Sequence, residues 1–204
     1  MTPITEDQSS RLGAFVKEVG RIVAEAGRSS EEEITSRIEV LLREVLTGGL
    51  QLAPGYREPR ADRYVMYPLA VARDGSWSIA SAVWDVGQAA PIHDHGTWGV
   101  IGILAGVEHE IGYWKPSPGD AGPLRLRMEH DLHPGEVMVC CTRDQDVHSV
   151  ACAASVPCVG VHVYGADIGT VTRHTYDLAT GAQRDFVSTW VLPAGVAELP
   201  WVTP

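Results

Sequence analysis

The first 50 residues carry apolar side chains at helical spacing. The first stripe places apolar residues three or four positions apart, at Leu12, Phe15, Val16, Val19, Ile22 and Val23. A second apolar stripe, over residues 34–45, follows Ser30 and Glu33, which form a capping-box pattern at a helix start. Two glycines at 48–49 end this second stripe. Because each amphipathic helix must bury one face, the pattern predicts a helical cap on a larger core.

From about Tyr64 the pattern changes to short runs of β-branched and aromatic residues. Turn residues separate the runs at intervals of roughly 8–12 positions, the spacing of a sandwich or a barrel. The runs predict strands over residues 63–71, 76–85, 99–106, 108–114, 124–130, 136–141, 147–152, 157–164 and 171–177. Turns are predicted at 73–75, 117–120 and 133–135. No helical pattern separates the strands, so a closed or double-sheet antiparallel β fold is favoured over a parallel βαβ sheet.

The length of the chain sets its domain organisation. A chain of 204 residues holds one well-buried core, and a second independent domain is not expected. We therefore expect a single domain over residues 1–204. Within it we expect a helical cap over 1–50, a β-barrel core over 60–180 and an irregular tail over 181–204.

The net charge and the lack of targeting signals limit the binding partners and the cellular location that we expect for this protein. The net charge of −10 argues against nucleic acid and against an anionic membrane surface as partners. The N-terminus lacks the basic start and apolar core of a signal peptide, and no apolar run is long enough to span a membrane. We therefore expect a cytoplasmic protein, and the sequence does not fix its oligomeric state. The cysteines form no CxxC pair and are expected to be free thiols: Cys140, Cys141, Cys152 and Cys158.

Two of the eight histidines, His93 and His95, lie one residue apart in the stretch PIHDHGTWGV. Residues i and i+2 of an extended segment point to the same side, so both imidazoles can reach one metal ion. Taken alone, the pattern fits two unrelated surface histidines equally well. Imidazole binds Fe, Zn, Cu and Ni, so the pair does not choose the metal.

The segment around this pair resembles the first motif of the cupin superfamily. Gly99 occupies the position that usually holds a glutamate ligand of the metal. The resemblance implies a cupin double-stranded β-helix, a jelly-roll barrel, with a third histidine ligand from a later strand, here His148. A site of three neutral histidines keeps the full charge of a divalent ion and therefore favours anionic co-ligands such as a thiolate. The matching positions are Gly87, His93, His95 and Gly106.

Three stretches within residues 60–177 resemble the small-thiol dioxygenases, which include cysteine dioxygenase and the bacterial 3-mercaptopropionate dioxygenases. The stretches are PIHDHGTWGVIGILAG, DVHSV and VGVHVYGADIGTVTRHTYD, and they match the bacterial branch better. The resemblance implies non-haem Fe(II) held by His93, His95 and His148. It also implies an oxidoreductase that uses both atoms of O2 to convert a small carboxylated thiol, 3-mercaptopropionate- or cysteine-like, to its sulfinate.

The same resemblance implies roles for four further residues. His162 and Tyr164 would form a pair that places the tyrosine hydroxyl over the substrate and oxygen site. Arg173 would hold the substrate carboxylate, a task that suits a planar guanidinium. Met66 stands where these enzymes have a polar carboxylate-binding residue, and a thioether donates no hydrogen bond. We therefore expect a thiol with a carboxylate and no amine, or a bulkier thiol, in preference to cysteine.

Two further departures from the family concern the neighbours of Tyr164. Gly160 replaces the serine that hydrogen-bonds to the relay histidine, so that bond is missing or supplied by water. No cysteine lies near Gly99 or Val100 in the sequence, so the cysteine–tyrosine crosslink of the mammalian enzyme is not expected.

Other interpretations of these residues stay open at this point. Arg173 could pair with Asp167 or Asp177 as a structural ion pair, and His162 could be a strand histidine without a role in chemistry. For the whole chain, one alternative is a different metallo-cupin enzyme: an isomerase, a lyase or a dioxygenase that cleaves carbon–carbon bonds. The other alternative is a non-catalytic cupin that binds a small acid.

Overall fold

The computed structural model describes residues 6–27, 29–115, 122–140, 142 and 146–203. The predicted turn at 117–120 and Cys141 lie outside these residues. The helices are α1 (Glu6–Ala26) and α2 (Glu31–Thr47), followed by a short 3-10 helix, Pro54–Tyr56. The strands are β1 (Val65–Ala72), β2 (Ser78–Trp84), β3 (Gly99–Ala105), β4 (Glu108–Trp114), β5 (Arg125–Leu132), β6 (Val137–Cys140), β7 (His148–Cys152), β8 (Cys158–Tyr164), β9 (Arg173–Tyr176), β10 (Gln183–Phe186) and β11 (Trp201–Val202).

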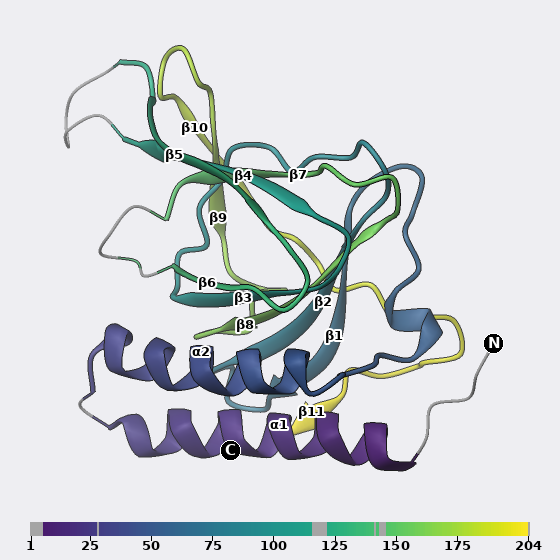
Figure 1. Cartoon of the computed structure of the whole chain (residues 1–204). Coiled ribbons are helices and arrows are strands. Elements are labelled where there is room, and N and C mark those ends of the chain that lie inside the picture. The colour runs from purple at the N-terminus through teal and green to yellow at the C-terminus, as the bar shows by residue number, and fades with distance from the viewer. Residues whose placement is uncertain (1–5, 28, 116–121, 141, 143–145, 204) are drawn as a thin grey trace.

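The strands form two sheets that face each other across a shared interior (Figure 1). The larger sheet has the order β11-β1-β2-β8-β3-β6, and the smaller one contains β5-β4-β7. The segment 88–94 extends the smaller sheet: His93 pairs with His148 of β7 on one side and with Thr175 of β9 on the other. After β3 the chain passes through β4 and β5, returns to the larger sheet at β6, and crosses again at β7 and β8. This winding is the double-stranded β-helix of a cupin, so the predicted fold class is confirmed.

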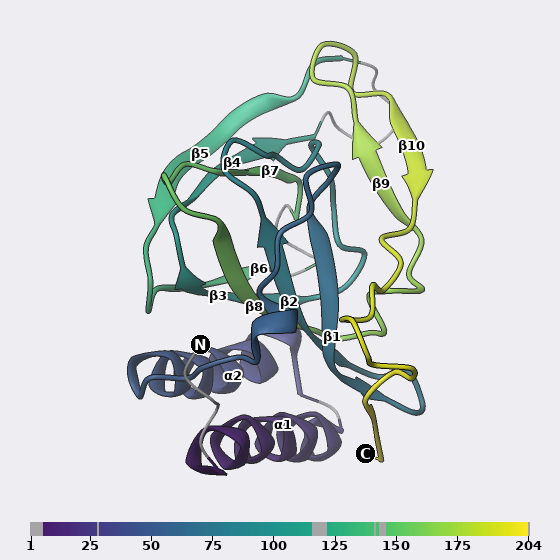
Figure 2. The ribbon, with the colours of Figure 1, turned by 90° about the vertical axis from the view of Figure 1, so that its right-hand side faces the viewer.

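The two helices cover the outer face of the larger sheet (Figures 1 and 2). Both buried stripes lie where the sequence predicts them, and the Ser30–Glu33 capping box is formed. Helix α2 lies so close to β3 that a Cβ on Gly102 would come within 2.6 Å of a methyl group of Leu46. The helical side chains buried here are Phe15, Val19, Ile22, Ile38, Leu42 and Leu46.

Strand β8 shows how one strand serves both the core and the interior between the sheets. All of its residues are buried. Because side chains alternate along a strand, one set packs in the core under the helices, and the other set faces the opposite sheet. The set in the core under the helices is Val159, Val161 and Val163. The alternate positions, Gly160, His162 and Tyr164, therefore face the interior of the barrel.

The tail is more ordered than the sequence indicates. The prediction of irregular chain over 181–204 is wrong at two places, because β10 pairs with β9 and β11 pairs in parallel with β1. Both strands are too short to carry a periodic pattern, and the partner of β11 lies far away in the sequence, at β1. Among the described residues, no helix combines the length and the apolar character that a membrane crossing needs.

Leu42→Ala tests the packing of the helical cap. Leu42 is 0% exposed between the helices and the sheet, so its truncation leaves a cavity. We expect the free energy of unfolding to fall by about 2–5 kcal/mol in urea denaturation. Val40→Ala on the same helix is the control, because Val40 is 59% exposed and its truncation should change stability by less than about 0.5 kcal/mol. Equal losses in the two variants would contradict the packing described here.

Candidate metal centre and substrate cavity

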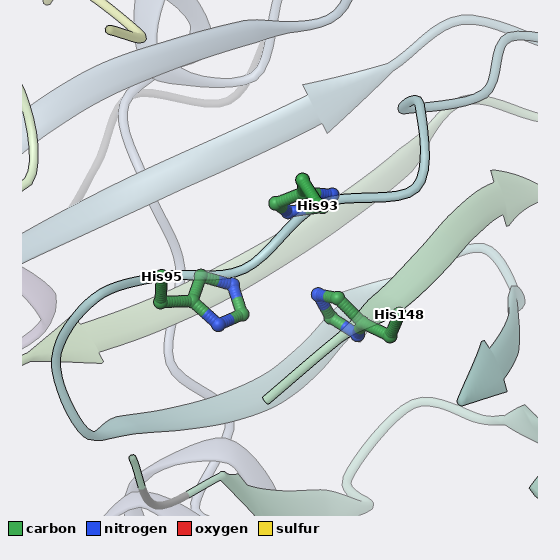
Figure 3. A group of neighbouring side chains, drawn as sticks. All are labelled: His93, His95 and His148. Carbon is green, nitrogen blue, oxygen red and sulfur yellow. The ribbon is translucent and has the colours of Figure 1, made fainter. Parts of the chain in front are cut away.

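Three histidines converge between the sheets. His93 and His95 lie in the extended segment before β3, and His148 is the first residue of β7. Their ligand atoms lie within 4.8 Å of one another, and all three side chains are buried. Figure 3 shows the three rings gathered around one small space. The pairing of His93 with His148 explains this, because it places two distant segments on adjacent strands of one sheet.

Each imidazole is fixed through its Nδ1 atom. The ring N–H donates to the Pro91 carbonyl from His93 (2.8 Å), to Asp146 Oδ1 from His95 (2.6 Å) and to Glu110 Oε1 from His148 (2.8 Å). This bond sets the tautomer and leaves Nε2 with its lone pair for a metal. The Nε2 atom of His148 is buried and has no hydrogen-bond partner in the described part of the chain. Three imidazole nitrogens oriented in this way fit a transition-metal ion.

Burial keeps the rings of His93 and His95 neutral. It lowers the pKa of both well below the usual value, and the neighbouring His148 and Arg173 side chains lower both further. Burial also raises the pKa of Asp146 to about 6, against the backbone N–H groups of His95 and Gly96 that donate to its carboxylate. A neutral imidazole is the form that binds a metal.

All seven residues singled out in the sequence line one cavity. Its volume is about 20 Å³, close to the room that one water molecule needs. The sequence-predicted members are Met66, His93, His95, His148, His162, Tyr164 and Arg173. Tyr64, Ala82, Trp84, Ala90 and Val150 complete the wall.

Arg173 is the charged residue of this wall. It is 1% exposed, its guanidinium lies 4.6 Å from the centre of the Phe186 ring, and its Nε and Nη2 atoms have no hydrogen-bond partner in the described structure. The acids that could have paired with it bond elsewhere: Asp167 accepts from the Trp190 indole, and Asp177 from Thr180. Two buried N–H donors therefore remain available to an anion in the cavity.

Asp94, between the two metal-site histidines, positions the strand that carries Arg173. Its carboxylate accepts hydrogen bonds from the backbone N–H and Nδ1 of His174, and from the hydroxyl of Tyr176. The His-Asp-His stretch is therefore joined to β9 through side chains as well as through the backbone. His174 itself points away from the cavity, as its place in the strand predicts.

Tyr164 and His162 form a pair on β8. The tyrosine hydroxyl and Nδ1 of His162 are hydrogen-bonded at 2.9 Å, and both side chains are buried. Burial raises the pKa of Tyr164 above its usual value and lowers the pKa of His162 to about 3. Both groups are therefore neutral, and the hydroxyl keeps its proton.

Sequence reasoning missed several residues of this site. Asp146 and Glu110 hold two of the imidazoles, and only their long-range contacts reveal it. The expectation that no cysteine lies near Gly99 is wrong in space, because β6 pairs Cys140 with Gly99. A Cβ on Gly99 would lie 2.8 Å from the Cys140 sulfur and 3.4 Å from the Tyr164 ring. Cys140, His95 and Asp146 form a second group with metal-binding atoms, next to the first and sharing His95 with it.

A wider cleft of about 280 Å³ lies next to the cavity. Tyr64 and Met66 line both spaces. The rest of the cleft wall comes from Arg63, Val65, Pro91 and the tail residues Phe186, Val187, Ser188, Thr189 and Val191. The cleft and the cavity thus adjoin at Tyr64 and Met66.

Comparison with known proteins gives limited similarity. No family model matches the chain. An oxalate oxidase structure shares 15% identity over 45% of this chain and 43% of its own, with a TM-score of 0.38. An RmlC-like cupin protein from Desulfovibrio desulfuricans shares 22% sequence identity over 53% of this chain and 88% of its own, with a TM-score of 0.38. A cupin superfamily protein from Desulfitobacterium hafniense shares 15% sequence identity over 57% of this chain and 90% of its own, with a TM-score of 0.42. The chain thus spans less than half of the oxalate oxidase, and its cupin architecture rests on its own strand order.

Proposed function

We propose that this protein is a non-haem iron(II) thiol dioxygenase acting on a small carboxylated thiol. The observation that carries the proposal is Arg173, whose buried guanidinium has two nitrogen atoms without a hydrogen-bond partner in the described structure and lines the same small cavity as the three histidines. A buried cation without a counter-charge is unfavourable, so a negatively charged substrate is the natural partner. The three histidines would hold the metal, and Arg173 in the same wall would bind a carboxylate.

His93, His95 and His148 would hold the iron. When bound, iron(II) would supply the redox chemistry by which a thiolate and O2 give a sulfinate, with four electrons passing from sulfur to the two oxygen atoms. The protein itself provides geometry and charge. Arg173 binds the carboxylate through its two free N–H donors, and the Tyr164 hydroxyl offers a hydrogen bond to a substrate atom in the cavity.

The wall of the cavity favours a thiol without an amine. None of the residues that line it carries a carboxylate, so an ammonium group would have no counter-charge there. Because the cavity holds about one water molecule, a thiol bound at the metal would extend past Met66 into the adjoining cleft. Met66 adds apolar surface where the two spaces adjoin. A 3-mercaptopropionate-like thiol meets these conditions better than cysteine.

Oxygen consumption with a thiol panel tests the proposal. We expect iron-loaded protein to consume one O2 per 3-mercaptopropionate and to form the sulfinate, identified by its mass, with slower turnover of cysteine and of cysteamine. Metal analysis of protein purified without added metal is the companion measurement. Protein that holds zinc, shows no iron dependence and consumes no O2 with any thiol of the panel would overturn the proposal. That outcome would favour another metallo-cupin enzyme or a cupin that binds a small acid.

A further inference from the structure

Glu108 is a buried carboxyl group that the proposed chemistry leaves unused. It lies at the start of β4, is 2% exposed, and its Oε1 atom has no hydrogen-bond partner in the described structure. The Nε2 atom of His162 is buried and unpartnered in the same way. Unsatisfied buried polar atoms are rare in folded proteins, and each calls for an explanation.

These two atoms border the same space beside Gly160, and no hydrogen bond joins them in the described structure. A Cβ added to Gly160 would collide with Nε2 of His162 and would lie 3.0 Å from Oε1 of Glu108. The missing side chain thus leaves room beside β8 that the imidazole edge and the carboxyl group share. Glu108 reaches this place because it points inward from β4, on the same face of the strand as Glu110.

We propose that the Glu108 carboxyl group closes onto Nε2 of His162 and acts as its positioning residue, so that Glu108, His162 and Tyr164 form a hydrogen-bonded relay that ends at the metal cavity. Gly160 is then the residue that makes the relay possible, because a serine there would occupy the space of the imidazole edge. The importance of this relay for turnover rests on the proposed function. The relay itself needs neither metal nor thiol.

The relay controls the direction of the Tyr164 hydroxyl. A neutral imidazole carries one proton, so its two nitrogens play opposite roles. When Glu108 is protonated it donates to Nε2, Nδ1–H donates to the tyrosine oxygen, and the hydroxyl proton is free to point into the cavity. When Glu108 is ionised it accepts from Nε2–H, and the hydroxyl donates to Nδ1 instead. Only the first arrangement offers the Tyr164 proton to a substrate.

The surroundings of Glu108 favour the first arrangement at neutral pH. Burial, and then the negative charge of Glu110, raise the pKa of Glu108 to about 8. The other titratable groups that face it in the described structure are Cys152 on β7, its cross-strand partner, and Cys158 and His162 on β8. The pKa of Cys158 is raised to about 12, so this thiol stays neutral over the range in which Glu108 titrates.

Nitrogen-15 NMR of the histidine side chains in metal-free protein tests the relay. We expect His162 in the wild type to carry its proton on Nδ1 at pH 6.5 and mainly on Nε2 at pH 9.5. Glu108→Gln, which keeps a hydrogen-bonding amide but cannot titrate, should hold one tautomer at both pH values. Glu108→Leu should also lose the pH response. Glu129→Gln on β5, a half-exposed carboxyl group, is the matched control and should behave as the wild type.

Two results would overturn the relay: a wild-type His162 tautomer that does not change between pH 6.5 and 9.5, or a change that persists in both Glu108 variants. The readout needs neither metal nor thiol, so it is separate from the proposed function. A tautomer switch in a protein that oxidises no thiol would support the relay and contradict the proposed dioxygenase activity. Thiol oxidation without the tautomer switch would contradict the relay alone.

Discussion

The His148→Ala variant is expected to purify without stoichiometric iron and to lose thiol oxidation. His148 supplies one of three imidazole nitrogens, and alanine leaves only His93 and His95 facing the site. Since changing a residue that merely orients a ligand already weakens metal binding by about 10- to 100-fold, loss of a ligand should weaken it by more than 100-fold. Metal analysis after dialysis and O2 uptake with added iron measure the two effects.

Two further variants accompany His148→Ala: one that should weaken iron binding less, and one control. Glu110→Gln should weaken iron binding by about 10- to 100-fold, because Glu110 accepts the Nδ1–H of His148 and orients the ring. His130→Ala is the control: its imidazole lies 4.0 Å from the other oxygen of Glu110 and is partly exposed. Full iron content in His148→Ala, or equal losses of iron in all three variants, would contradict iron binding by the three histidines.

Arg173→Met is expected to change activity and stability in opposite directions. Loss of a buried charge-assisted contact of about 3–4 kcal/mol should lower kcat/KM for 3-mercaptopropionate by about 10²- to 10³-fold, mainly through KM. In the free protein, however, the buried guanidinium contacts the Phe186 ring but has no counter-charge, its Nε and Nη2 atoms have no hydrogen-bond partner in the described structure, and methionine fills similar space without a charge. The variant should therefore unfold at a higher urea concentration than the wild type.

Cysteamine provides the internal control for Arg173. It has the sulfur chain of the substrate but an ammonium group in place of the carboxylate, so its kcat/KM should not fall in Arg173→Met and should rise if the two positive charges repel each other. Thiol-dependent O2 uptake and urea denaturation, measured on the same preparations, give both numbers. Equal losses for the two thiols would show that Arg173 supports the fold of the site and does not bind the carboxylate.

The fold was accessible from the sequence because its signals are local. The helical stripes, the capping box and the alternation of strands such as 158–164 all appear within short windows, and the structure has them at nearly the same bounds. The His93–His95 pair is local in the same sense. The two tail strands carried no such signal, since four-residue and two-residue strands are too short for periodicity.

The polar residues that orient the metal-site histidines could not be predicted from the sequence, because they act through contacts between residues far apart in the chain. Asp146 contacts His95 across 51 positions, and Glu110 contacts His148 across 38. Glu108 lies over Gly160 only because the two sheets face each other. Cys140 reaches Gly99 through strand register alone. A glycine in the place of a serine indicates a lost hydrogen bond when only the sequence is considered, whereas in space it leaves room that both Glu108 and His162 border.

The C-terminal tail gives the site a second part that can vary separately from the metal ligands. The three histidines belong to the barrel, whereas the cleft beside them is lined in part by residues 186–189 and 191, which are joined to the chain around β1 by the Val191–Met66 backbone bond and the Tyr64–Ser188 hydroxyl pair. Phe186 contacts His93 and Arg173, but substitutions at 187–189 and 191 would alter the cleft without changing a metal ligand. Under the proposed function, a duplicated gene could thus acquire a new thiol through these residues while its oxygen chemistry stays intact.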